Sequence, residues 1–328
     1  MSLMINELVD DLYKILTTTT ANNRYYSARA LGFRSELEFV REFIKKRADF
    51  MTGGKFLFFE QNSAASAERK LPYITISPDS PENYVLFYNK LMNFPLCGEM
   101  FFLQHSMEIN KWKRIDFEMK NESGQNIVSS IFEPDYQVYK FNGKKFSKTQ
   151  INEILNLLPD KAIKSCVIKD KSVFTYLRKY SIDELSMIYA DRYFIDVLLR
   201  KKANSLSDFD GIWVNGHNYV LIEMKEKDPG PKDRILNKIP KEKWFFGWDT
   251  RRLSWYLYIV QSTGLNVMYA IREVDNQKER NFIGWKYLYI TDFARSAEWL
   301  SRSGGGGKSE TTPAPYLKFK DLTSLINS

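Results

Sequence analysis

Three residues combine two carboxylates with an amine at a spacing that can bring them together. Asp210 is followed after twelve residues by Glu223, Met224 and Lys225. Two carboxylates can share one divalent cation through hard oxygen ligands, as Mg²⁺ requires. A lysine beside that ion can orient or deprotonate an attacking water, or stabilise negative charge at phosphorus. The set therefore predicts metal-assisted hydrolysis of a phosphate ester.

A β-hairpin is expected to position these residues. Apolar runs at 212–214 and 219–222 flank Asn215-Gly216, a dipeptide typical of two-residue hairpin turns. Asp210 is predicted on the first strand. Glu223 and Lys225 are two residues apart on the second, so their side chains share one face of the sheet. Charges at the end of an apolar strand need partners, because burying an unpaired charge costs several kcal/mol.

The predicted metal ligands are the carboxylates of Asp210 and Glu223, with the backbone carbonyl of Met224 as a further oxygen donor. A neighbouring cation lowers the pKa of an ammonium group, which suits Lys225 to act as a general base. Asp210, Glu223 and Lys225 are thus the candidate catalytic residues.

This pattern resembles the PD-(D/E)XK signature of many type II restriction endonucleases and DNA-repair nucleases. The resemblance covers residues 181–290, about a third of the chain. In that family a helix precedes the hairpin, and a helix and a further strand follow it. The helices predicted at 181–202 and 250–262 and the strands at 266–274 and 284–290 match this order. Two features depart from the family: Phe209 stands where proline is common, and little chain remains between 202 and 208 for the usual first strand.

The resemblance implies a restriction-endonuclease-like mixed sheet flanked by helices. It implies Mg²⁺ as cofactor, replaceable by Mn²⁺, double-stranded DNA as substrate and a homodimer as the active form. In the family the preceding helix often adds an acidic metal ligand, for which Asp191 and Glu184 are both candidates.

A second Glu-x-Lys pair competes with the first. Glu118 and Lys120 end a predicted strand, with Glu108 or Glu99 upstream. The chain after this pair is β-like and offers no packing helix, which makes it the weaker candidate. A third interpretation treats Asp210, Glu223 and Lys225 as an ordinary cross-strand salt-bridge cluster at a sheet edge.

Basic and aromatic residues alternate after the predicted hairpin. From Lys225 to Arg252 there are nine Lys or Arg and five acidic residues, interleaved with four aromatic residues between 244 and 248. Such a segment can follow DNA phosphates. The alternative is that the aromatic rings anchor it to the core. The candidate DNA contacts are Lys227, Lys232, Arg234, Lys238, Lys241, Lys243, Arg251 and Arg252.

The chain has 328 residues, enough for about two domains. We expect a helix-plus-β module at 1–155, for DNA recognition or dimerisation, and the nuclease core at 156–328, in an α/β protein (α+β overall). Helices are predicted at 4–17, 149–158, 171–180 and 35–48, the last with Ser35 as N-cap and Glu38 completing a capping box. Ser181 and Glu184 are predicted to form a second capping box at the start of the helix at 181–202. Surface loops are expected at 62–70 and around Gly304–Gly307. Strands are predicted at 56–59, 73–76, 84–88, 100–104, 114–119, 127–132 and 136–141.

The composition favours a polyanionic partner and excludes several kinds of site. Lys and Arg number 48 against 40 Asp and Glu, a formal charge of +8. Two cysteines, Cys97 and Cys166, rule out a disulfide framework or a Cys-rich zinc site, and two histidines are too few for a His-based metal cage. No apolar run approaches the ~20 residues that cross a bilayer, and the N-terminus lacks signal-peptide features, so we expect a cytoplasmic location.

The sequence thus predicts a Mg²⁺-dependent endodeoxyribonuclease, of which a type II restriction endonuclease cutting a specific double-stranded sequence is the leading form. One alternative is a structure-specific repair, recombination or transposon-end nuclease. Another is a non-catalytic nucleic-acid-binding protein whose acidic cluster is only structural.

Overall fold

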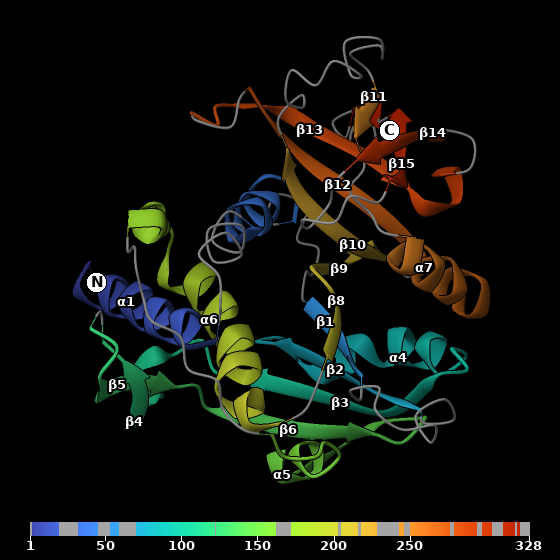
Figure 1. Ribbon diagram of the computed structural model, residues 1–328. Coiled ribbons are helices and arrows are strands. Elements are labelled where there is room, and N and C mark those ends of the chain that lie inside the picture. Colours follow the sequence, from blue (N-terminus) through green and yellow to red (C-terminus); the bar gives the residue numbers. More distant parts are fainter. Residues whose placement is uncertain are drawn as a thin grey trace. The chain divides into compact units, whose positions relative to one another are not determined.

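Figure 1 shows the computed structural model of residues 1–328. The residues described are 2–19, 32–44, 53–58, 70–121, 123–161, 172–202, 205–215, 218–227, 243–245, 250–275, 279–293, 297–303, 311–318 and 320–321. The chain divides into two compact units: unit 1 is Met1–Lys46 with Met51–Phe209, and unit 2 is Arg47–Phe50 with Asp210–Ser328. This division lies later in the chain than the domain boundary expected at 155, so the helix predicted at 181–202 packs within unit 1.

Unit 1 contains a six-stranded sheet in the order β7-β6-β3-β2-β1-β8. Its strands are β1 (Gly53–Phe58), β2 (Leu71–Ser77), β3 (Cys97–His105), β6 (Tyr136–Phe141), β7 (Phe146–Thr149) and β8 (Ser205–Phe209). β2 and β3 are parallel and the other pairs are antiparallel. A parallel pair needs a crossover connection, which here contains a 3₁₀ turn (Pro81–Tyr84) and helix α4 (Val85–Leu91).

The strand predicted at 84–88 is therefore wrong. Tyr84, Phe87, Tyr88 and Leu91 are all buried. Their separations of three and four residues follow the period of a helix and not the alternation of a strand. The aromatic composition of the segment favours a strand, but its residues are buried at helical spacing and the segment forms a helix. The other predicted β runs are confirmed, as β1 to β6.

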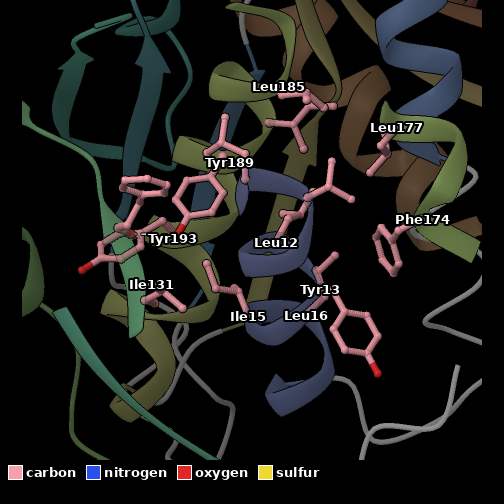
Figure 2. Packing of buried hydrophobic residues seen from close by; sticks show 14 of the residues in the cluster. Leu12, Tyr13, Ile15, Leu16, Ile131, Phe174, Leu177, Leu185, Tyr189 and Tyr193 are labelled. Atoms are coloured by element: carbon pink, nitrogen blue, oxygen red, sulfur yellow. Dashed lines mark hydrogen bonds between the residues drawn. The ribbon is translucent and has the colours of Figure 1, made fainter. Parts of the chain in front are cut away.

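A helical layer and a β-hairpin form the second core of unit 1. It comprises α1 (Ser2–Thr19), which confirms the helix predicted at 4–17, α6 (Ile182–Asp196), a 3₁₀ helix (Ser172–Lys179) and the hairpin β4 (Lys113–Lys120) and β5 (Asn126–Glu133). Figure 2 shows Leu12 and Ile15 of α1 packed with Ile131 of β5 and Tyr189 of α6. Unit 1 also contains 3₁₀ turns at Ile109–Lys111 and Leu198–Lys201, and α5 (Ile151–Leu155).

Two predicted helix caps have opposite outcomes. Before α6, Ser181 Oγ accepts a hydrogen bond from the Glu184 N–H (3.3 Å), and Glu184 Oε2 accepts one from the Ser181 N–H (2.8 Å), which confirms the second capping box. Ser35, in contrast, lies inside a segment that is α-helical at 32–39 and π-helical at Val40–Ile44. Its buried hydroxyl has no hydrogen-bond partner in the described part of the chain. The predicted N-cap at Ser35 is wrong, because the helix begins upstream of it.

Unit 2 contains a five-stranded mixed sheet in the order β16-β13-β12-β10-β9. Its strands are β9 (Gly211–Asn215), β10 (Asn218–Lys227), β12 (Asn266–Val274), β13 (Phe282–Tyr289) and β16 (Lys320–Asp321). β10 and β12 are parallel and the other pairs are antiparallel. Helix α7 (Thr250–Thr263) lies in the crossover between the parallel pair, as Figure 1 shows. The predicted hairpin, the following helix and the two later strands are confirmed.

A smaller three-stranded sheet of unit 2 has the order β11-β15-β14, formed by β11 (Lys243–Phe245), β15 (Thr311–Lys318) and β14 (Ala297–Ser303). A 3₁₀ turn at Ile290–Asp292 follows β13. Helices combined with mixed sheets confirm the α/β class. No helix among the described residues is long and apolar enough to cross a membrane. The predicted loop at 62–70, apart from Lys70, and the segment Gly304–Gly307 lie outside the described residues.

Candidate active site

The hairpin of unit 2 places Asp210 beside the charged end of β10. The last pair of the β9–β10 ladder joins Gly211 to Ile222. Asp210 therefore lies at a bend directly before β9, not on the strand as predicted. Beyond Ile222, β10 continues alongside β12 as far as Lys227. Glu223 and the residues after it thus have an edge that β9 does not cover.

Asp210 forms a hydrogen bond at this edge of β10. Its Oδ2 accepts a hydrogen bond of 2.6 Å from the backbone N–H of Met224. In an extended strand the N–H and C=O of one residue point to the same edge. The carbonyl of Met224 therefore faces the edge at which Asp210 lies, which is the arrangement that a backbone metal ligand needs.

Glu223 is buried, with 1% of its surface exposed. Its Oε1 lies 2.6 Å from the Nζ of Lys225. Its Oε2 accepts a 2.7 Å hydrogen bond from the hydroxyl of Tyr256, a fully buried residue of α7. Both oxygens thus have partners, which satisfies a carboxylate taken out of water. Tyr256 is a site residue that the sequence prediction missed. Its apolar spacing places it on the inner face of α7, but the partner of its hydroxyl depends on the tertiary structure.

Lys225 lies between the two carboxylates. Its Nζ is 2.6 Å from Glu223 Oε1 and 3.9 Å from Asp210 Oδ2, and its side chain is 40% exposed. Burial alone would lower the pKa of Lys225, but the charges of Glu223 and Asp210 outweigh it and hold this pKa well above its ordinary value. In this arrangement Lys225 is a protonated cation that solvent can reach. The expected pKa decrease presupposes a neighbouring metal ion.

The donor set fits a magnesium ion. Within the described ranges no group of three or more His, Cys, Asp or Glu side chains could hold a metal. Mg²⁺ however usually keeps several waters and binds through one or two carboxylates together with substrate phosphates. Asp210 and Glu223 already direct oxygens at one cation, the ammonium of Lys225. With the carbonyl of Met224 they form a set of hard oxygen donors.

The two acidic candidates on α6 have partners inside unit 1. Glu184 caps the helix and accepts hydrogen bonds from Arg41 Nε (2.7 Å) and Nη2 (2.8 Å). The carboxylate of Asp191 forms an ion pair with Lys55 of β1, whose side chain is 2% exposed. Glu184 thus has a structural role in helix capping, and the contact of Asp191 is with a buried cation.

The competing Glu-x-Lys pair does not form a similar centre. Glu118 is exposed on β4, which pairs with β5 along its whole length. The upstream acids bind other lysines: Glu108 lies 2.7 Å from Lys111, and Glu99 lies 2.5 Å from Lys140. The geometry therefore favours the site on β10.

Only one of the candidate DNA contacts has a described side chain. Lys227 ends β10, and its Nζ lies 5.9 Å from the centre of the Tyr269 ring. The backbone places Lys243 in β11 and the two arginines of the pair 251–252 in the first turn of α7. The side chains of Lys232, Arg234, Lys238, Lys241, Lys243, Arg251 and Arg252 lie outside the described part of the chain.

Comparison of the chain with protein-family models, with curated proteins and with solved structures gives no significant match.

Proposed function

We propose that this chain is a Mg²⁺-dependent endodeoxyribonuclease of the PD-(D/E)XK type that hydrolyses phosphodiester bonds in double-stranded DNA. The observation that carries the proposal is the convergence of Asp210 and Glu223 on Lys225 at the end of β10. The order hairpin, helix, parallel strand supports it, because β9, β10, α7 and β12 follow the arrangement that the resemblance implies. The formal charge of +8 favours a polyanionic substrate.

Each residue of the site has a distinct task in this proposal. Asp210, Glu223 and the carbonyl of Met224 would hold the magnesium ion. When bound, the ion supplies positive charge to the phosphate and lowers the pKa of water. With the carboxylates engaged by an ion, the ammonium of Lys225 would be able to orient the attacking water or to stabilise charge on the phosphate oxygens. Tyr256 fixes the orientation of Glu223 through its hydroxyl.

Within this chemistry, the form we propose is a type II restriction endonuclease that acts as a homodimer, with one active site for each DNA strand. This step rests on analogy with the family. The large additional module of unit 1 supports it, since a homodimer that reads a DNA sequence needs surfaces for dimerisation and base contacts.

Incubation of supercoiled plasmid with the protein, in Mg²⁺ and in EDTA, tests the proposal. Discrete fragments that form only with Mg²⁺ are the expected result. Nicked circles or smears would instead favour a repair or transposon-end nuclease. Retained DNA binding without any cutting, in Mg²⁺ or in Mn²⁺, would contradict catalysis and leave the carboxylates as a structural salt-bridge cluster.

A further inference from the structure

A buried carboxylate holds two arginines on the face of β10 opposite the candidate active site. Glu226 follows Lys225 directly, so its side chain points to the other face. Its Oε2 accepts a hydrogen bond from Arg272 Nη1 (2.8 Å), and its Oε1 accepts one from Arg280 Nε (2.5 Å). The side chain of Glu226 is 2% exposed. One buried carboxylate therefore fixes two guanidinium groups.

The cluster has an excess of one positive charge and unused donors. Each guanidinium carries five N–H groups. The Nε of Arg272 is buried without a hydrogen-bond partner in the described ranges. Within the described ranges the side chain of Arg280 makes one hydrogen bond, from its Nε to Glu226, and it is 20% exposed. The Nη groups of Arg280 are thus available to an incoming ligand. A planar guanidinium fork matches two oxygens of a phosphate.

Hydrogen bonds fix Asn281, the residue that follows Arg280. Asp275 accepts hydrogen bonds from both the backbone N–H (2.9 Å) and the side-chain amide (2.8 Å) of Asn281. Arg280 itself has a φ of 56°, in the left-handed region that non-glycine residues rarely adopt. A group fixed in this way loses little conformational entropy when it binds.

An exposed aromatic ring adjoins the arginines. Phe282 is 45% exposed, and its ring centre lies 4.9 Å from the guanidinium carbon of Arg272. The neighbouring Ile283 is 54% exposed. Apolar surface beside a cation suits a ligand that has both a phosphate and a sugar or base, since these rings can pack on an aromatic face.

The cluster lies at the same end of the sheet as the candidate active site. Arg272 is opposite Glu226 in the parallel pair of β10 and β12, and Arg280 lies in the turn after β12. In α/β sheets, ligands bind beyond the carboxyl ends of the parallel strands. A polymer that crosses this end can therefore reach Lys225 on one face and Arg280 on the other.

We propose that Arg280, supported by Arg272 and Glu226, binds a backbone phosphate of duplex DNA next to the phosphate that is cleaved. The inference rests on the proposed function, because it assigns the substrate of that site a second anchoring point. If the cluster were purely structural, one arginine would be enough to neutralise one carboxylate. A phosphate contact explains why a second arginine, with its Nη groups available, is also present.

The test is the binding of a mixed-sequence DNA duplex in EDTA, measured over a series of salt concentrations. Arg280→Gly removes the fork at a position whose backbone conformation glycine adopts readily. We expect its affinity to fall about tenfold and the slope of log K against log salt to decrease in magnitude by about 0.9. Lys286→Ala removes one charge from β13 of the same sheet and is the control. It should leave both quantities close to those of the wild type.

An unchanged slope and affinity in folded Arg280→Gly would overturn the inference. If that variant does not fold, Arg280→Lys is the second test, because lysine keeps the positive charge but lacks the guanidinium fork. A lower DNA affinity with an unchanged salt slope supports the phosphate contact. An unchanged DNA affinity refutes it. Plasmid cleavage by the wild type is measured in parallel. A wild type that cuts DNA while the variants bind normally overturns this inference alone. A wild type that neither cuts nor binds DNA overturns the proposed function as well.

Discussion

Lys225 occupies the place between two carboxylates that a divalent cation would take. Its ammonium neutralises Glu223 and Asp210, at 2.6 and 3.9 Å. Glu223 also accepts a hydrogen bond from the hydroxyl of Tyr256. A divalent ion bound here would compete with the ammonium for these oxygens, and the hydrogen bond from Tyr256 would help to keep the carboxylate of Glu223 in position.

Tyr256→Phe tests this positioning. Loss of the hydroxyl removes a hydrogen bond from Glu223 Oε2, and groups that orient a metal ligand are typically worth about 10–100-fold in metal affinity. We expect the Mg²⁺ concentration for half-maximal cleavage to rise about tenfold, with little change in the maximal rate. Tyr258→Phe, the same change on the exposed side of α7, is the control. Equal Mg²⁺ dependence in both variants would show that the contact of Tyr256 serves only packing.

The positions of the candidate catalytic residues could be predicted from the sequence, whereas those of their supporting residues could not. Strand alternation after an Asn-Gly turn is enough to place Glu223 and Lys225 on one face near Asp210. The partners of Glu226 depend on the register of β10 against β12, which is set by a crossover of some forty residues. No local pattern in the sequence records that register, so Arg272 and Arg280 were not among the predicted site residues.

At the scale of elements, two serines at helices show what a local motif can and cannot predict. Ser181 and Ser35 both have an acidic residue three positions later, as a capping box requires. Only Ser181 lies at a helix start in the structure. The segment around Ser35 continues upstream as helix, so the local pattern is the same but the role of the hydroxyl differs.

We therefore predict opposite effects of alanine at the two positions. Ser181→Ala should lower the free energy of unfolding by about 1 kcal/mol, because it removes the N-cap of α6. Ser35→Ala should be neutral or stabilising, because the buried hydroxyl has no partner in the described chain and alanine favours a helix. Chemical denaturation of both variants provides the measurement. A loss at Ser35 as large as that at Ser181 would contradict the assignment.

The α4 segment illustrates the same limit for whole elements. Its aromatic side chains have high strand propensity, but tertiary packing buries them at helical spacing against the sheet. Strands and helices with a clear period, such as β10 and α1, could be predicted to within a few residues. The domain division could not, because the contacts that assign α6 to unit 1 are with α1, far away in sequence.

At the scale of the whole molecule, acid should destabilise the fold through His105. This residue is buried at the end of β3, and burial lowers its pKa from 6.5 to about 4, against smaller opposing effects of a hydrogen bond with the Ser106 backbone and of the charge of Asp191. The unfolded chain therefore binds a proton more tightly than the folded one between these values. Stability is fully present above pH 6.5 and decreases as the pH falls towards 4, by about 3 kcal/mol from this residue.

His105→Phe isolates this contribution, because the aromatic ring keeps its packing near Trp112 and no longer titrates. Urea denaturation at pH 6.5 and at pH 4 should show a smaller loss of stability in the variant than in the wild type. Identical losses in the two proteins would mean that His105 is protonated in the fold, against the pKa decrease described above.

We propose that Asp210, Glu223 and Lys225 cut DNA with a magnesium ion, and Lys225→Ala is the most direct test of this activity. Plasmid cleavage in Mg²⁺ should fall at least about a hundredfold, while duplex binding in EDTA remains close to that of the wild type. Lys286→Ala, the charge-matched control, should cut normally. Cleavage by Lys225→Ala at the rate of the wild type would contradict the account.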